Sequence, residues 1–301
     1  MIIDTDPGVD DAVALMLAAA SPAVQLLAVT TVFGNVGVEL TTANALRLRA
    51  LAGLGQLPVA AGAARPLVYP QDQRPHSWHG PDGLGGRACL LPEPTGPIHH
   101  RGAVALMADL LHAASARVTL VAIGPLTNIA LLLAAHPEVK PRINRIVAMG
   151  GLLSGDPLTE FNIRSDPEAA HRVLAEEDVP ATLVPLDLTL QAAVGGAWLT
   201  ELAAAGPRCA TLAGVIEHCR ETMGRDRVVL HDVLAVLEAA VPGTLRTTSM
   251  PLAVVCDHGP ARGAVLTSSD QCANTHMVQV ALDADLPTIN AAILDRLRSL
   301  E

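Results

Sequence analysis

The stretch Asp4-Thr5-Asp6-Pro7-Gly8-Val9-Asp10-Asp11 places four carboxylates in eight residues, directly after the apolar run Met1-Ile2-Ile3. The apolar run predicts a buried strand, Pro7-Gly8 a turn, and the apolar residues after Asp11 a helix. Aspartate is a favoured helix cap, so one or two of the four could be caps. Capping alone does not account for all four aspartates. Because crowded like charges repel strongly when buried, the cluster predicts a hard divalent cation or a catalytic role.

Strand-like and helix-like segments alternate along the first 186 residues. The predicted strands are residues 1–3, 24–32, 57–60, 118–123, 143–149 and 181–186. The predicted helices between them are residues 41–51, 104–114, 126–135 and 168–176. This alternation predicts an α/β fold with an open, mostly parallel central sheet flanked by helices. Ligands of such folds bind outside the carboxyl ends of the strands.

Polar segments follow four of the predicted strands, so four loops should converge on one crevice. They are the Asp cluster, Gly34-Asn35, Gly124-Pro125-Leu126-Thr127-Asn128 and Gly150-Gly151. Residues 65–97 are rich in proline and glycine and predict a long lid or binding loop. After residue 185 we expect helix to about residue 242, strands at 252–256, 263–267 and 276–282, and a helix near 286–300. Without a repeat or a linker, residues 1–301 predict a single domain.

Composition limits the class of protein. A hydrophobic fraction of 50% and a mean hydropathy of +0.37 predict a globular chain with a large core. The net charge is −10 and Lys140 is the only lysine, so we expect no nucleic-acid partner. The cysteines are odd in number and form no CxxC pair, which favours a reducing cytoplasm. We expect no signal peptide and no membrane span.

A series of motifs resembles the calcium-dependent nucleoside hydrolases, the inosine-uridine-preferring family. The motifs are Asp4-Thr5-Asp6-Pro7-Gly8-Val9-Asp10-Asp11-Ala12, Thr31-Val32-Phe33-Gly34-Asn35, His79-Gly80, Gly124-Pro125-Leu126-Thr127-Asn128, Met149-Gly150-Gly151, Glu160-Phe161-Asn162, Asp166-Pro167-Glu168-Ala169 and Leu230-His231-Asp232. They span residues 4–232 in the order in which the family carries them.

The resemblance implies hydrolysis of the N-glycosidic bond of a ribonucleoside to free base and ribose, in nucleoside catabolism and salvage. It also implies one Ca²⁺ per chain and a cytoplasmic homo-oligomer, either a dimer or a tetramer. Such cleavage passes through an oxocarbenium-like ribose, so it needs an activated water, anionic groups near the sugar and stabilisation of the departing base. Carboxylates, a metal and a histidine can supply these.

The resemblance also assigns the metal and catalytic residues. Asp6, Asp11, Asp232 and the backbone carbonyl of Ile123 would hold Ca²⁺, which suits an all-oxygen site. Asp6 would take a proton from the metal-bound water, whose pKa the cation lowers. His231, beside Asp232, would assist the departing base by hydrogen bonding or proton donation. A lone histidine in an apolar stretch is more often a core residue, but its adjacency to Asp232 favours the catalytic role.

A second group of residues would bind the substrate. Asp10 would hold the ribose 2′ hydroxyl, and Met149 would lie beside the sugar. Contacts to the other ribose hydroxyls are assigned to Asn35, Glu160 and Asn162. For His79 a base contact and a plain surface position remain open, and Trp78 could cover the base by stacking.

This chain departs from the family pattern near the substrate. The segment between Gly151 and Glu160 is short and lacks the usual asparagine, so Ser154 or Asp156 would have to meet the 5′ hydroxyl. Residues 221–229 lack the tyrosine that family members often carry. The preference for purine or pyrimidine bases therefore stays open.

Two other functions compete with nucleoside hydrolysis. A phosphatase of the haloacid dehalogenase class also begins with a strand ending in Asp-x-Asp, but it needs a basic residue near the phosphoryl group, and Lys140 is poorly placed for that. A non-catalytic nucleoside or ribose binder of the same fold is the other alternative. The complete set of carboxylates, with Asn162 and His231, argues against it.

Overall fold

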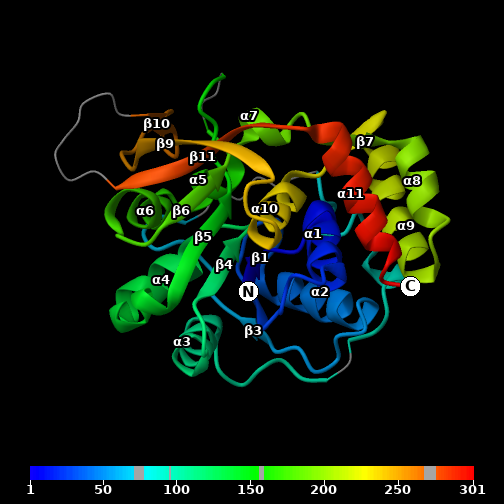
Figure 1. The fold of residues 1–301 in the computed structure, drawn as a ribbon, viewed down its shortest axis with the longest axis horizontal. Helices are drawn as coiled ribbons and strands as arrows, with labels where there is room; N and C mark the ends of the chain where they lie inside the picture. Colours follow the sequence, from blue (N-terminus) through cyan, green and yellow to red (C-terminus); the bar gives the residue numbers. More distant parts are fainter. Residues whose placement is uncertain (71–77, 95, 156–158, 268–275) are drawn as a thin grey trace.

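A nine-stranded sheet forms the centre of the structure, a computed structural model that describes residues 1–70, 78–94, 96–155, 159–267 and 276–301 (Figure 1). Its strands are β1 (Ile2–Thr5), β2 (Ala28–Thr31), β3 (Val59–Ala61), β4 (Val118–Ala122), β5 (Ile143–Met149), β6 (Ala181–Val184), β9 (Leu245–Val254), β10 (Val265–Thr267) and β11 (Met277–Ala284). They lie in the order β10-β9-β11-β6-β5-β4-β1-β2-β3. Pairing is parallel from β3 to β11 and antiparallel at β9 and β10. The predicted mostly parallel sheet is confirmed.

Strand β1 contributes side chains to both faces of the sheet, because successive residues of a strand point in opposite directions. Ile2 pairs with Leu120 of β4 and packs into one buried cluster. Ile3 pairs with Val121 and packs into the other cluster. The apolar run at the N-terminus is therefore buried on both sides, as parallel strands usually are.

Helices cover both faces (Figure 1). They are α1 (Val9–Ala20), α2 (Val38–Leu51), α3 (Ala103–Ala113), α4 (Thr127–Ala135), α5 (Phe161–Ser165), α6 (Pro167–His171), α7 (Leu186–Thr189), α8 (Gly196–Ala203), α9 (Pro207–Thr222), α10 (His231–Ala240) and α11 (Leu286–Arg298), with short turns η1 (Ala88–Leu90), η2 (Pro137–Arg142) and η3 (Arg172–Glu176). Helices α3, α4 and α6 pack into one core cluster. Helices α1, α2 and α8 to α11 pack into the other.

The largest differences between predicted and observed elements lie in three places. Strand β9 begins at Leu245, seven residues before the predicted strand, because its polar first half is held by antiparallel pairing with β11. The predicted helix 168–176 is divided between α6 and η3. A separate two-stranded ribbon, β7 (Ala193–Gly195) with β8 (Arg227–Val229), was not predicted, since three residues are too few to show a period.

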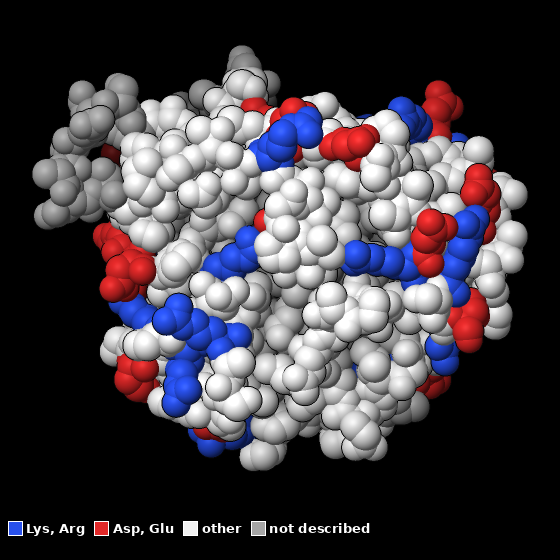
Figure 2. Space-filling view, in the orientation of Figure 1, with Lys and Arg blue, Asp and Glu red and all other residues white. Residues whose placement is uncertain are grey.

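The surface in Figure 2 is mostly uncharged, and basic side chains on this face lie singly or in small groups beside acidic ones. Within the described residues, each helix is either too short or too polar to cross a lipid bilayer. The cysteines that the structure describes, Cys89, Cys209, Cys219 and Cys256, are free thiols.

Candidate active site

The corner between β1 and α1 holds the first carboxylates. The Thr5 hydroxyl at the end of β1 donates to Asp11 Oδ1 at 2.5 Å, and the backbone N–H of Gly8 donates to Asp11 Oδ2 at 2.8 Å. Asp11 therefore caps the first turn of α1 while lying in the acidic cluster. The same carboxylate thus caps the helix and belongs to the candidate site. Asp10, the residue before it, is also buried but does not cap the helix.

Asp6 lies just beyond the end of β1, between the loop that contains Gly34 and the loop that contains Gly124. Its Oδ2 accepts the backbone N–H of Asn35 at 2.7 Å, and its carbonyl accepts the Asn35 side-chain amide at 3.1 Å. Its Oδ1 is buried and has no hydrogen-bond donor among the described residues. A Cβ on Gly124 would lie 2.5 Å from that oxygen, so the loop after β4 closes against it. An unpaired buried carboxylate oxygen is costly, and a cation would satisfy it.

Three carboxylates converge beside this corner. One oxygen each from Asp10, Asp11 and Asp232 lies within 4.8 Å of the others, and all three residues are buried. Asp232 belongs to the first turn of α10, so the cluster joins two helix N-termini, where the helix dipole favours negative charge. Asp6 is not part of this closest triad but lies near enough to interact electrostatically with it.

Burial and mutual repulsion raise the pKa values of Asp6, Asp11 and Asp232. The pKa of Asp6 is well above its ordinary value because of burial and then the charge of Asp11. Burial, with Asp10 next, raises the pKa of Asp11 to about 6. Burial and the charges of Asp10, Asp11 and Asp6 hold the pKa of Asp232 well above its usual range. Negative charges gathered in this way attract a divalent cation.

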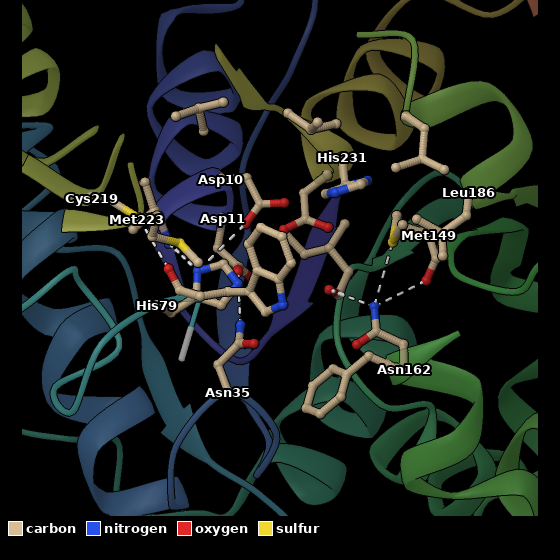
Figure 3. A pocket seen from close by; sticks show the side chains of 18 of the residues that line it. Asp10, Asp11, Asn35, His79, Met149, Asn162, Leu186, Cys219, Met223 and His231 are labelled. Carbon is tan, nitrogen blue, oxygen red and sulfur yellow. Dashed lines mark hydrogen bonds and ion pairs between the residues drawn. The ribbon is translucent and has the colours of Figure 1, made fainter. Parts of the chain in front are cut away.

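The opposite wall is built around Asn162 at the start of α5. Its side-chain amide donates to the carbonyls of Ile123 and Met149, each at 3.2 Å (Figure 3). Glu160 caps α5: its carboxylate accepts the backbone N–H groups of Asn162 and Ile163 at 2.8 and 3.0 Å, and that of Gly151 at 2.9 Å. The loops after β4 and β5 are thus fixed to each other through Asn162 and Glu160.

These groups surround one cavity of about 350 Å³. The structure brings the predicted site residues together there, since its lining includes Asp10, Asp11, Asn35, His79, Ile123, Met149, Glu160, Asn162, His231 and Asp232. In Figure 3 the labelled aspartates, Asn35 and His79 lie across the cavity from Met149 and Asn162. Asp6 is not among the lining residues and lies behind Asn35. Loops that follow neighbouring parallel strands meet at this cavity, as we expected from the sequence.

The two predicted histidines are held in different ways. His231 is largely buried, which lowers the pKa of its imidazole, and its Nδ1 lies 2.8 Å from the hydroxyl oxygen of Thr189. His79 accepts the backbone N–H of Val9 on its Nδ1 at 3.0 Å, and that nitrogen lies 4.0 Å from Asp10 Oδ1. His79 is therefore part of the cavity wall, not a free surface residue.

The remaining wall is apolar with arginines at its rim. Leu186, Val228 and Met223 line it together with Trp78, whose ring carries the Arg225 guanidinium 3.9 Å from its centroid. Trp78 is 42% exposed, so the stacked pair lies at the mouth of the cavity. A flat apolar surface with a cation behind it suits an aromatic ring.

Two supporting residues were not identified from the sequence. Thr189 and Asp187 both belong to α7, and Asp187 accepts the hydroxyl of Ser154 at 2.5 Å. Ser154 does not line the cavity, and Asp156, the other candidate for the 5′ hydroxyl contact, lies outside the described residues. No local pattern marks Thr189 and Asp187, because their partners are distant in sequence. Asp4, the first aspartate of the N-terminal cluster, accepts hydrogen bonds from Asn128 and Thr30.

This chain is similar to a known family of enzymes over most of its length. A family model for the inosine-uridine preferring nucleoside hydrolases matches residues 1–291. A pyrimidine-specific ribonucleoside hydrolase, RihA of Shewanella baltica, is 47% identical over 197 residues, and the match spans 64% of this chain and 61% of that protein. A non-specific ribonucleoside hydrolase, RihC of Escherichia coli, is 39% identical over 95% of this chain and 94% of its own length. A purine-preferring ribonucleoside hydrolase from Gardnerella vaginalis superposes with a TM-score of 0.91 at 29% identity, covering 99% of this chain and 98% of that one.

Proposed function

Because this chain belongs to the inosine-uridine preferring nucleoside hydrolase family, we propose that it hydrolyses the N-glycosidic bond of ribonucleosides to free base and ribose. The observation that carries the proposal is a cavity in which buried carboxylates, amide groups and two histidines meet. A ribose hydroxyl cluster needs such polar groups, and an apolar end beside them suits a base.

We assign the cation site to Asp6, Asp11, Asp232 and the carbonyl of Ile123, with Asp10 beside it. The donors are all hard oxygens, the Asp6 Oδ1 atom lacks a partner among the described residues, and the neighbouring carboxylates repel one another. These properties fit Ca²⁺, which takes carboxylate and carbonyl oxygens in a flexible geometry. When bound, the cation supplies positive charge that offsets this repulsion and lowers the pKa of water.

Asp6 is the group that receives the proton of the attacking water. Without a cation, burial and the charge of Asp11 raise the pKa of this carboxyl above its ordinary value. Asn35 fixes the orientation of the carboxylate by a 2.7 Å hydrogen bond to Oδ2. We assign the 2′ hydroxyl to Asp10 and the other ribose hydroxyls to Asn35, Glu160 and Asn162, with Met149 beside the sugar.

The departing base is assigned to the side of the cavity that contains His231. As the glycosidic bond breaks, its electron pair moves to the base nitrogen, and an N–H of His231 stabilises that charge. His79 and Trp78 complete this end and contact the base. The relatives include pyrimidine-specific, non-specific and purine-preferring enzymes, so we propose a ribonucleoside without fixing the base.

The phosphatase alternative finds no support in the site. Lys140 is paired with Glu177 at 2.5 Å and Asp178 at 3.1 Å, and it does not line the cavity. A phosphoryl group bound among these carboxylates would lack that lysine as a counter-charge. The non-catalytic binder differs from the hydrolase only in turnover, so an assay separates the two.

The test is release of ribose and free base from inosine, guanosine, adenosine, uridine and cytidine, with p-nitrophenyl phosphate as a phosphatase substrate. We expect release from at least one nucleoside and none from the phosphate ester. Phosphate release alone would support the phosphatase. Binding of nucleosides without release from any of them would support the binder.

We also propose a single-domain, cytoplasmic homo-oligomer, either a dimer or a tetramer. The free thiols of the described cysteines support a reducing compartment. Light scattering during size-exclusion chromatography tests the oligomer: the mass of one chain, 31.2 kDa, would contradict it.

A further inference from the structure

Thr189 is the one described residue that hydrogen-bonds to the His231 ring. Its side chain is fully buried at the end of α7, and its hydroxyl oxygen lies 2.8 Å from His231 Nδ1. This bond occupies Nδ1 and leaves Nε2 for the cavity that His231 lines. A hydroxyl can donate or accept, so the distance alone is compatible with either neutral tautomer.

The meeting of Thr189 and His231 is fixed by the backbone around them. The N–H of Leu230, which precedes His231, donates to the Ala192 carbonyl at 3.1 Å. Beyond that bond, Ala193 pairs with Val229 in the β7–β8 ribbon. At the first residue of α7, the N–H of Leu186 donates to the Gly151 carbonyl at 2.8 Å. The hydroxyl is therefore held in place independently of substrate.

The partners of the Thr189 hydroxyl decide the direction of the bond. Among the described residues, His231 Nδ1 is the one hydrogen-bond partner of this buried hydroxyl. A buried hydroxyl proton needs an acceptor, so the hydroxyl donates and Nδ1 accepts. The proton of the neutral imidazole is then on Nε2.

We propose that Thr189 is a positioning residue that donates its hydroxyl proton to Nδ1 of His231 and so keeps the Nε2–H tautomer facing the departing base. The inference rests on the proposed nucleoside hydrolysis. In that reaction the base nitrogen gains an electron pair as the glycosidic bond breaks, and Nε2–H donates a hydrogen bond or the proton to it. The opposite tautomer would place a lone pair against the lone pair of the base.

The kinetic test compares Thr189→Val, which removes the hydroxyl at nearly constant volume, with Thr189→Ser, which retains it. For Thr189→Val we expect kcat on the best nucleoside to fall about 10- to 100-fold, part of what general acid assistance usually provides. The loss on p-nitrophenyl riboside, whose leaving group needs no proton, should be less than about threefold. Thr189→Ser should recover most of the nucleoside activity.

A matched control is Thr200→Val, because Thr200 lies on the exposed side of α8, where its hydroxyl donates to the Gly196 carbonyl, and it does not line the cavity. This variant should keep the wild-type kcat on both substrates. Two results would overturn the positioning role. One is an equal loss of kcat on both substrates in Thr189→Val, and the other is a Thr189→Ser variant that recovers no nucleoside activity.

A second readout does not depend on turnover. Nitrogen-15 NMR of histidine-labelled protein loaded with Ca²⁺ distinguishes protonated from unprotonated ring nitrogens, and the His231→Ala spectrum identifies the signals of His231. We expect Nε2 protonated and Nδ1 unprotonated in the wild type, and a mixed or reversed pattern in Thr189→Val. A protonated Nδ1 in the neutral wild-type ring would overturn the proposal even if the enzyme is active, and the expected pattern would support it even if no nucleoside is cleaved.

Discussion

Gly34 lies directly against the carboxylate of Asp6. A Cβ built on Gly34 would lie 2.0 Å from Asp6 Oδ2, closer than any real Cβ contact. The backbone of the loop after β2 can therefore approach the end of β1 only because residue 34 has no side chain. This approach lets Asn35 donate its N–H to the same carboxylate oxygen at 2.7 Å.

Replacing Gly34 with alanine should therefore displace Asp6. We expect a drop in kcat of at least about 100-fold and a loss of about 1 to 3 kcal/mol in unfolding free energy, because overpacked sites must shift. Steady-state kinetics and urea unfolding measure the two effects. Gly55→Ala is the control, since a Cβ there meets no atom within 4 Å. Wild-type kcat in Gly34→Ala would show that the position of Asp6 does not matter.

Replacing Asp232 with asparagine should uncouple thermal stability from Ca²⁺. In chelator the variant should melt no lower than the wild type, because one of several repelling buried carboxylates is gone. Added Ca²⁺ at a large excess over its Kd should raise the wild-type Tm by about 5 to 10 °C and the variant far less. Differential scanning calorimetry measures both.

Asp283→Asn is the matched control, because Asp283 pairs with Arg246 on the exposed surface. It should keep the full response to Ca²⁺. An unchanged Ca²⁺ response in Asp232→Asn would remove Asp232 from the cation site.

Replacing His231 with alanine should separate substrates by their leaving group. Nucleosides should lose about 100- to 10,000-fold in kcat, the usual contribution of a general acid. p-Nitrophenyl riboside should lose much less, because nitrophenolate departs without a proton. Parallel assays on both substrates measure the ratio, and similar losses on both would exclude His231 from assisting the base.

Asp4 should make stability depend on pH. It is buried on β1, and burial raises its pKa to about 7 although Thr30 and Asn128 donate to Oδ1. Because the folded pKa exceeds the unfolded one, the native state binds the proton more tightly, so this residue lowers unfolding free energy as pH rises from about 4 to about 7. The full contribution is at most about 4 kcal/mol.

The measurement is urea unfolding of wild type and Asp4→Asn across that pH range in chelator. The carboxylates of the cation site titrate in both proteins, so the difference between the two curves isolates Asp4. We expect the wild type to lose stability relative to the variant as pH rises. A difference that is flat in pH would show that Asp4 keeps an ordinary pKa.

Local sequence patterns were sufficient for the parallel part of the fold. Ile2 and Ile3 belong to a run that is apolar throughout, which is typical of a strand buried on both faces, and the loops after such strands had to share one edge. The polar half of β9, from Arg246 to Ser249, carries no such pattern, because its pairing with β11 places it on an exposed edge. Ribbon β7–β8 was missed because its strands are too short.

The candidate site divides in the same way. Asp10 and Asp11 are adjacent, so their crowding is visible in the chain, whereas Ile123 would contribute a carbonyl oxygen that any residue type carries and was identified only by family resemblance. Thr189 lies 42 residues from His231, and Asp187 meets Ser154 across 33 residues. Such contacts depend on how α7 is placed by tertiary structure, which no local pattern reports.

We infer that the carboxylate corner holds a cation needed for nucleoside hydrolysis. The direct measurement removes metal with chelator, exchanges the protein into metal-free buffer and follows ribose release from the best nucleoside as Ca²⁺ is added in steps. We predict negligible turnover at first and a rise that saturates near one Ca²⁺ per chain, with Asp6→Asn staying inactive throughout. Full turnover by the metal-free protein would show that hydrolysis needs no cation.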